Sequence, residues 1–152
     1  MKTKHWIRVG FAGAAFTLSS CGTSNSVVII DAPPPPVVLP NGMTRTASGL
    51  QYQILEPGTG RAAHSGSLVT VAYLGMFPNG KVFDQSPANN PFEFALGTGY
   101  VIKGWDEGLD GMKVGEKRKL IVPPSLGYGA RQAGAIPPNS TLWFEIHMLD
   151  VK

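Results

Sequence analysis

The sequence predicts an α+β fold in which an antiparallel β-sheet half-barrel wraps around one short α-helix. The strongest observation is that segments on both sides of one central stretch alternate apolar and polar residues, which is typical of strands with one buried face. In the central stretch, Ile102, Trp105 and Leu109 recur at helical spacing. Its glycines weaken a free helix by about 1 kcal/mol each relative to alanine. We therefore expect the sheet to support this helix and Trp105 to point into the concavity, either as a core residue or as the floor of a cavity.

The expected strands follow in order along the chain, and the last of them has the clearest alternation. They are residues 50–55, 68–76, 81–84, 92–96, 117–122 and 142–148. Pro78-Asn79-Gly80 predicts a hairpin turn between the second and third strands. Residues 125–139 form a long connection rich in glycine and proline, and a long loop without its own structure is usually functional.

The first twenty residues are predicted to be a lipoprotein signal peptide. Three basic residues precede an apolar run, residues 9–18, that is too short to span a membrane as a helix. Leu18-Ser19-Ser20-Cys21 then resembles a bacterial lipobox. The resemblance implies cleavage before Cys21 and lipid attachment to it, the alternative being a spare thiol in a processed leader. Gly22 favours the outer membrane, so we expect a lipid-anchored protein of the cell envelope that faces the periplasm.

Residues 21–42 are expected to be a lipid-anchored, proline-rich linker, and residues 43–152 the folded domain. Four consecutive prolines, residues 33–36, favour a stiff polyproline II segment. The likeness of this segment to a proline-rich recognition motif leaves that role open as an alternative to a spacer. Fully extended, about 22 residues reach roughly 70 Å at about 3.1 Å per residue, so the domain could work far from its membrane.

Charge and residue types exclude several classes of function. Lys and Arg number 13 and Asp and Glu 10, and removing the three basic residues of the leader leaves ten of each. No basic surface is therefore expected for nucleic acid, and Lys117-Arg118-Lys119 is interpreted as a solvated strand face. Three scattered histidines predict no metal site. No nucleophile motif or dinucleotide-binding motif is present, and no cofactor is expected. Asp106-Glu107 resembles a catalytic pair, but two acidic residues in the first turn of a helix are explained by the helix dipole.

The remaining chemistry is aromatic, and it comes from several strands, the helix and the long loop. The residues are Tyr73, Phe83, Phe92, Phe94, Tyr100, Trp105, Tyr128, Trp143 and Phe144. Those that project into the concavity would line an apolar cup with a few polar tips, the usual form of a small-ligand site. This pattern predicts binding of an apolar group with one or two carbonyls, and it specifies no reaction.

Five short motifs and the last strand resemble the FKBP-type peptidyl-prolyl isomerase domain, over roughly residues 50–152. The motifs are Val71-Ala72-Tyr73-Leu74-Gly75, Gly80-Lys81-Val82-Phe83-Asp84, Val101-Ile102-Lys103-Gly104-Trp105, Tyr128-Gly129-Ala130 and Ile136-Pro137-Pro138, followed by Thr141-Leu142-Trp143-Phe144-Glu145. Each motif is weak alone, but their order and spacing together are highly specific. With the lipobox, the whole chain resembles a bacterial lipoprotein form of that family.

The resemblance implies a set of site residues. It assigns the isomerisation to Tyr73, Phe83, Asp84, Trp105, Tyr128 and Phe144, and substrate binding to Phe92, Val101, Ile102 and Ile136. Trp105 would be the floor, with the other aromatic residues, Val101 and Ile102 as walls and Ile136 on a flap. The backbone N–H of Ile102 and the hydroxyl of Tyr128 would donate hydrogen bonds to the substrate's carbonyls. Two segments depart from the family pattern: residues 85–90 carry no charge, and the flap at residues 131–135 has no aromatic or histidine tip.

The implied function is cis–trans isomerisation of X-Pro bonds in exported proteins, with proline-containing polypeptides as substrates. Binding of tacrolimus or rapamycin is implied too, and the changed flap would weaken it. Two alternatives come from other classes. One is a non-catalytic chaperone or peptide-binding module, and the other is a structural envelope lipoprotein with a degenerate pocket. The aromatic residues and polar side chains that the sequence keeps at the pocket positions argue against the structural lipoprotein.

Overall fold

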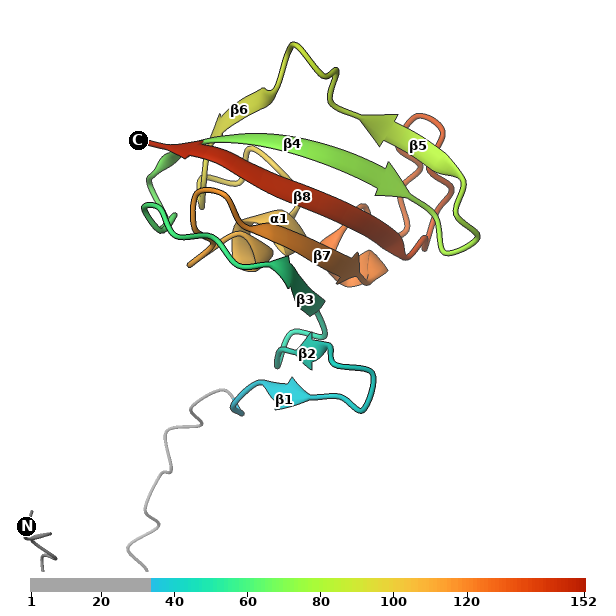
Figure 1. Cartoon of the computed structure of the whole chain (residues 1–152). Coiled ribbons are helices and arrows are strands. Elements are labelled where there is room, and N and C mark those ends of the chain that lie inside the picture. The colour runs from blue at the N-terminus through green and yellow to red at the C-terminus, as the bar shows by residue number, and fades with distance from the viewer. Residues whose placement is uncertain (1–33) are drawn as a thin grey trace, which may run out of the picture. The chain divides into compact units, whose positions relative to one another are not determined.

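The computed structural model describes residues 34–152, and the predicted signal peptide, Cys21 and the first part of the linker lie outside these residues. Within this range one antiparallel sheet accompanies one short α-helix (Figure 1). The elements are β1 (Val37–Val38), β2 (Thr44–Arg45), β3 (Gln51–Glu56), β4 (Leu68–Met76), β5 (Val82–Gln85), β6 (Phe92–Ala95), α1 (Lys103–Gly108), β7 (Lys117–Val122), the 3₁₀ helix η1 (Pro124–Leu126) and β8 (Leu142–Val151). The predicted fold class is confirmed.

The sheet has the strand order β1-β2-β3-β7-β8-β4-β5, and β6 also pairs with β4. The two longest strands, β4 and β8, lie side by side in its middle, from Val69 opposite Val151 to Met76 opposite Trp143 (Figure 1). On the other edge of β4, β6 pairs with residues 68–71 and β5 with residues 74–76. The polar connection between β5 and β6 therefore joins two strands that pair with opposite ends of the same edge of β4.

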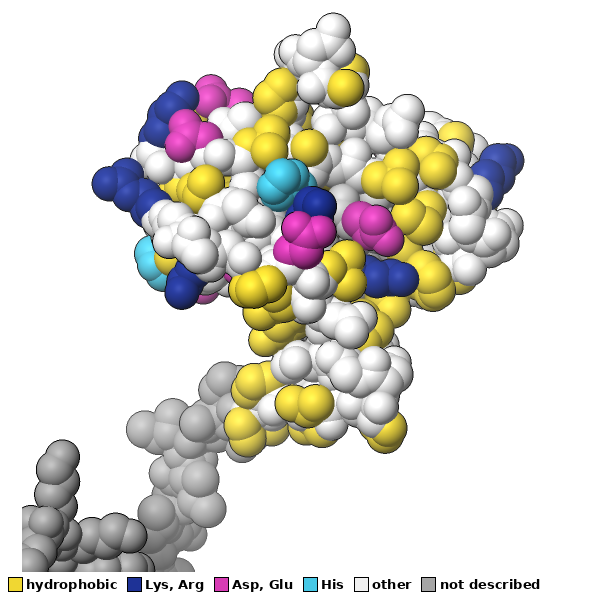
Figure 2. All heavy atoms as spheres, in the orientation of Figure 1, with side chains coloured by type: hydrophobic (Ala, Val, Ile, Leu, Met, Phe, Trp, Pro, Cys, Tyr) yellow, Lys and Arg dark blue, Asp and Glu magenta, His cyan; other side chains and the backbone are white. Residues whose placement is uncertain are grey.

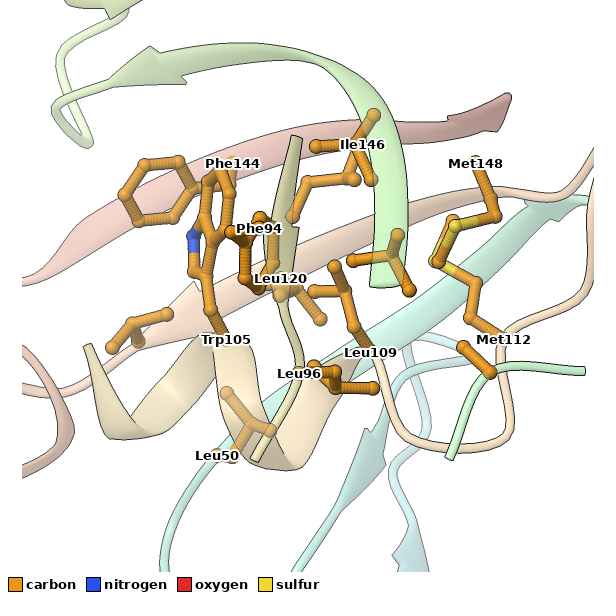
Figure 3. Close-up of a cluster of buried hydrophobic side chains, with 14 of the residues drawn as sticks. Leu50, Phe94, Leu96, Trp105, Leu109, Met112, Leu120, Phe144, Ile146 and Met148 are labelled. Carbon is orange, nitrogen blue, oxygen red and sulfur yellow. The ribbon is translucent and has the colours of Figure 1, made fainter. Parts of the chain in front are cut away.

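The core lies between the concave face of the sheet and α1. Alternate residues of β8 are buried, from Leu142 through Phe144 and Ile146 to Met148, as the alternation predicts. From the helix side, Trp105 and Leu109 enter the same core. Figure 3 shows Trp105 standing on α1 beside Phe144 and Phe94, with Leu109 and Leu96 next to them.

The expected hairpin at Pro78-Asn79-Gly80 is present between β4 and β5. Gly80 has φ of +83°, a left-handed conformation that glycine adopts without strain. Its N–H donates to the carbonyl of Phe77, and the Phe77 N–H donates to the carbonyl of Lys81. This turn sets the register that brings Phe83 and Asp84 beside the end of β4.

Two strand predictions differ from the structure near the N-terminal edge. Val37 and Val38, within the predicted linker, pair with Arg45 and Thr44, so the sheet begins before residue 43. The expected strand at residues 50–55 does not keep one apolar face, because Ile54 is 49% exposed. A register shift between Ile54 and Glu56 interrupts the alternation there.

The interpretation of Lys117-Arg118-Lys119 as a solvated strand face is wrong for its middle residue. Arg118 is only 7% exposed and points toward the core. Its Nε donates to Glu116 at 2.8 Å, its Nη1 donates to the carbonyl of Gly108 at 2.7 Å, and its guanidinium lies 5.1 Å from the ring centre of Tyr52. The alternation of β7 forces this residue inward, and the buried carboxylate makes its charge tolerable.

The outer face of the sheet carries paired charges. The Lys117 ammonium donates to the Glu56 carboxylate at 2.7 Å, and the Lys119 ammonium lies 4.5 Å from the ring centre of Trp143. Figure 2 shows acidic and basic side chains next to one another on the face turned to the viewer, among hydrophobic ones. None of the helices in residues 34–152 has the length and apolar character needed to cross a bilayer.

Candidate functional site

A cavity of about 610 Å³ opens above the N-terminal end of α1. All ten residues that the sequence assigned to the site line this cavity: Tyr73, Phe83, Asp84, Phe92, Val101, Ile102, Trp105, Tyr128, Ile136 and Phe144. They come from β4, β5, β6, α1 and the segment before it, the long connection after β7, and β8. The fold thus brings together residues that are more than seventy positions apart, and their roles in catalysis stay predictions.

Trp105 forms the floor of the cavity and belongs to the core as well. It is 4% exposed, and the rings of Tyr73 and Phe144 meet it edge-on, with centroids 5.1 and 5.3 Å away. The two alternatives for Trp105, core or floor, are therefore both realised, because one side of the indole packs on the core and the other is a cavity wall. Its Nε1 is buried without a hydrogen-bond partner among the described residues.

The walls are a set of edge-on aromatic contacts. Phe83 meets Phe144 at a centroid distance of 5.7 Å and an interplanar angle of 87°. These rings reach one another over Gly75, since a Cβ at that position would lie 2.8 Å from the Phe83 ring and 3.0 Å from the Phe144 ring. The chain therefore needs glycine at position 75 to keep this wall in place. Phe94 packs on Trp105 from the core, and Trp143 faces outward, so these two aromatic residues lie outside the cavity lining.

A phenol and a carboxylate form the polar side of the cavity. The Tyr73 hydroxyl donates a hydrogen bond of 2.8 Å to Asp84 Oδ2, and the Gln85 N–H donates to Asp84 Oδ1. Burial raises the pKa of Tyr73 to about 12, and the hydrogen bond to Asp84 and its negative charge act in the same direction. Tyr73 therefore stays protonated at neutral pH and holds the carboxylate of Asp84 at the rim.

Two further donors border the cavity. Ile102 is the N-cap residue of α1, and its carbonyl accepts from the N–H groups of Trp105 and Asp106. Its own N–H is the donor of no hydrogen bond found within residues 34–152. Tyr128 lies across the cavity and is 42% exposed. These two groups can donate to carbonyl oxygens of a bound chain, which suits the roles that the family resemblance implies.

The flap above the cavity is short and internally bonded. The N–H of Ala133 donates to the carbonyl of Ile136, and the N–H of Ile136 donates back to the carbonyl of Ala133. This closed pair turns Ile136 inward, so that it is only 7% exposed and covers one side of the cavity. The residues between them are small, as the sequence showed.

Four further residues line the cavity: Tyr100, Ala133, Gly134 and Ala135. Sequence reasoning named Tyr100 among the aromatic candidates and residues 131–135 as a flap, but it assigned none of the four to the site. It also explained Asp106 by the helix dipole alone. In the structure, Asp106 accepts hydrogen bonds from the N–H groups of Gly97 and Gly99 at 2.8 and 3.1 Å. The signal available in the sequence was the position of Tyr100 directly after Gly97-Thr98-Gly99 and before the Val101-Ile102 motif. No cluster of three metal-binding side chains occurs in the part of the chain that the structure describes.

An apolar cavity with a few donors at its rim is suited to an apolar group that carries carbonyls. Comparison with known proteins gives the family. The family model described as "FKBP-type peptidyl-prolyl cis-trans isomerase" matches residues 59–149. The chain belongs to the FKBP-type peptidyl-prolyl cis-trans isomerase family, and it carries the enzyme domain of that family.

The relatives place this domain in proteins of different length. FK506-binding protein 1 of Dictyostelium discoideum is 51% identical over 106 residues, which are 68% of this chain and 99% of that protein. FK506-binding protein 4 of Neurospora crassa is 46% identical over 113 residues, 74% of this chain. This chain spans only 24% of the length of the Neurospora protein.

Two solved structures share the fold. FkpA from Escherichia coli is 45% identical with a TM-score of 0.68, over 73% of this chain and 52% of that one. AtFKBP13 is 41% identical with a TM-score of 0.67, over 72% of this chain and 98% of that one. The residues that resemble a lipobox lie before the matched residues, so the lipid anchor and the lipoprotein form stay predictions.

Proposed function

We propose that this domain accelerates rotation about X-Pro bonds, with the proline ring seated in the cavity over Trp105. The observation that carries this proposal is the floor itself, a buried indole bordered by edge-on aromatic rings. Such a surface matches a compact, apolar pyrrolidine ring. The family membership of the chain supports the same reaction.

The reaction breaks no covalent bond in this mechanism, so it needs no nucleophile. The barrier of about 18–20 kcal/mol exists because resonance gives the C–N bond partial double-bond character. The charge-separated resonance form is stabilised by water, and the aromatic walls formed by Phe83, Trp105 and Phe144 exclude water. Moving the bond into this cavity therefore lowers its double-bond character.

Hydrogen bonds placed for the twisted bond give a second contribution. The Ile102 N–H and the Tyr128 hydroxyl would hold carbonyls on either side of the proline while the bond rotates. A donor that fits the twisted geometry better than the planar one stabilises the transition state preferentially. Asp84, fixed by Tyr73, would set the polarity of the rim beside these carbonyls.

The proposed setting is the bacterial cell envelope, with exported polypeptides as substrates. The lipobox supports lipid attachment at Cys21, and Gly22 supports the outer membrane facing the periplasm. Several acyl chains on one cysteine anchor firmly, at about 0.8 kcal/mol per buried CH₂. Labelling cells with radioactive palmitate and fractionating their membranes tests this, because Cys21→Ala should abolish both the label and the membrane association. An unlabelled wild-type chain would overturn the anchor.

Macrolide binding is part of the same proposal. The relatives' names state that they bind FK506, the macrolide tacrolimus. The cavity offers that ligand the same floor and donors, and the small flap at Ala133–Ala135 offers it few contacts. Calorimetric titration of the full chain with tacrolimus tests binding, and competition by tacrolimus against a proline peptide tests whether both share the cavity.

The experiment that tests the activity is isomerisation of a Leu-Pro or Phe-Pro peptide by the full chain purified in detergent. We expect catalysis by the wild type and a loss of at least about ten-fold in kcat/KM in Trp105→Ala and Asp84→Ala. Trp105→Ala could cost about 3–5 kcal/mol of stability, so circular dichroism must show that each variant is folded. A folded wild-type chain without catalysis would overturn the isomerase and leave a chaperone or peptide-binding module.

A further inference from the structure

The rim of the cavity carries one aromatic ring that the proposed mechanism does not use. Tyr100 lines the cavity and is 71% exposed, the most exposed large hydrophobic side chain within residues 34–152 except Val38. Its ring stacks on that of Phe92 at a centroid distance of 6.3 Å and an interplanar angle of 23°. Phe92 in turn meets Tyr73 and Trp105 edge-on, at 6.0 and 6.2 Å. A continuous aromatic surface therefore runs from the floor to the solvent-exposed rim.

The backbone before Tyr100 is held by the helix. Gly97 and Gly99 have φ of +76° and +74°, conformations that other residues adopt only with strain. Both of their N–H groups donate to the carboxylate of Asp106, one to each oxygen. This bidentate bridge fixes the turn to α1, which also carries Trp105. The ring of Tyr100 is thus presented at a defined distance from the floor.

Three residues of the flap offer little apolar surface. Ala133 and Ala135 line the cavity with a single methyl group each, and Gly134 between them has no side chain. Of the exposed rings that line the cavity, Tyr100 at 71% is more exposed than Tyr128 at 42%. A substrate residue next to the proline would therefore find its largest apolar contact at Tyr100 and Phe92. A tyrosine ring also supplies contact area at low entropic cost, because it has only two side-chain torsions.

We infer that Tyr100 determines specificity, by packing its exposed ring against an aromatic side chain of the substrate adjacent to the proline. This inference rests on the proposed isomerase function. Stacked aromatic pairs stabilise a complex more than the burial of their surface alone does. We expect this extra stabilisation to give aromatic substrates a preference of about three- to ten-fold in kcat/KM.

The test uses three proline peptides of equal length with the full chain in detergent. One has alanine on both sides of the proline, one has phenylalanine before it and one has phenylalanine after it. For each phenylalanine peptide the measured quantity is its kcat/KM divided by that of the alanine peptide. We expect Tyr100→Ala to lower this ratio about three- to ten-fold for at least one of the two phenylalanine peptides. The peptide that responds shows whether Tyr100 contacts the residue before or after the proline. Tyr100→Phe, which keeps the ring, should preserve the ratio.

Controls separate the outcomes. Leu149→Ala removes an exposed apolar side chain outside the cavity lining and should leave both ratios unchanged. Asp106→Ala, which frees the turn before Tyr100, should lower the same ratio as Tyr100→Ala, in keeping with a positioning residue. Equal ratios in the wild type and Tyr100→Ala in both arms would overturn the inference while the isomerase stands. A folded wild type that isomerises none of the peptides would overturn the proposed function itself.

Discussion

The two ends of α1 differ in how completely their polar groups are paired. At the C-terminal end, the carbonyl of Gly108 accepts from Arg118, and Arg118 is paired with the buried Glu116. At the N-terminal end, the Ile102 N–H and the Trp105 Nε1 have no partner within residues 34–152. Leu109 beyond the paired end is fully buried, whereas Trp105 borders a cavity.

This difference explains how so short a helix can support a binding site. Buried polar groups are normally hydrogen-bonded, so the unpaired Trp105 Nε1 marks the cavity end of the helix as the less saturated one. A donor helps a ligand only if it does not move away, and one helix of six residues has little stability of its own. The ionic pair and the leucine packing at the far end supply the rigidity that the cavity end lacks.

The largest expected effect comes from breaking the paired end. Arg118→Met would leave the Glu116 carboxylate buried without its cation, so we expect a loss of about 3–5 kcal/mol in the free energy of unfolding. Urea denaturation measures this loss. The double variant Glu116→Gln, Arg118→Met is the matched control, because removing both charges should restore most of the stability. A loss below about 1 kcal/mol in the single variant would contradict a structural role for the pair.

The next effect tests whether packing at this end is separate from catalysis. Leu109→Ala deletes a fully buried side chain and should lower the free energy of unfolding by about 2–5 kcal/mol. The kcat/KM of the folded fraction should stay within about two-fold of the wild type. Leu149→Ala is the control, since the same deletion at a 39% exposed site should change stability by less than about 0.5 kcal/mol. A large drop in kcat/KM at full folding would show that the two ends are coupled.

Most of the fold could be predicted from the sequence, because the alternation of apolar and polar residues in a strand reflects which of its faces is buried. The period of β8 predicted its buried face residue by residue, and the resemblance placed all ten assigned residues around one cavity. Local pattern was sufficient there because each side chain points to the face that its position in the strand dictates.

The pattern failed where hydrogen-bond partners outside the strand or helix period decide the outcome. Arg118 was predicted to be solvated because a charged residue is rarely buried alone, and its burial depends on Glu116 and on the carbonyl of Gly108. Asp106 was explained by the helix dipole, and its hydrogen bonds reach a turn seven to nine residues earlier. Tyr100 was known as an aromatic residue, but only the turn geometry places it on the rim.

A smaller effect is expected at the cavity end, on activity alone. Tyr128→Phe removes one hydroxyl from a 42% exposed ring, so stability should not change measurably. The kcat/KM for a Leu-Pro peptide should fall about three- to ten-fold, the worth of one hydrogen bond in the transition state. Tyr52→Phe is the control, because its ring packs near Arg118, outside the cavity lining. An unchanged kcat/KM in Tyr128→Phe would exclude this hydroxyl as a contributor.

The smallest effect concerns the phenol that fixes Asp84. The pKa of Tyr73 is raised to about 12 in the folded protein, against about 10 in an unfolded chain. Below pH 10 the phenol is protonated in both states, so its contribution to stability is fully present. As the pH rises from 10 toward 12, the unfolded state releases the proton first and that contribution is lost.

Urea denaturation should therefore show a constant difference in the free energy of unfolding between the wild type and Tyr73→Phe up to pH 10. By pH 11 the difference should shrink by less than about 1 kcal/mol, because the ring is partly exposed. A difference that grows with pH would contradict the raised pKa.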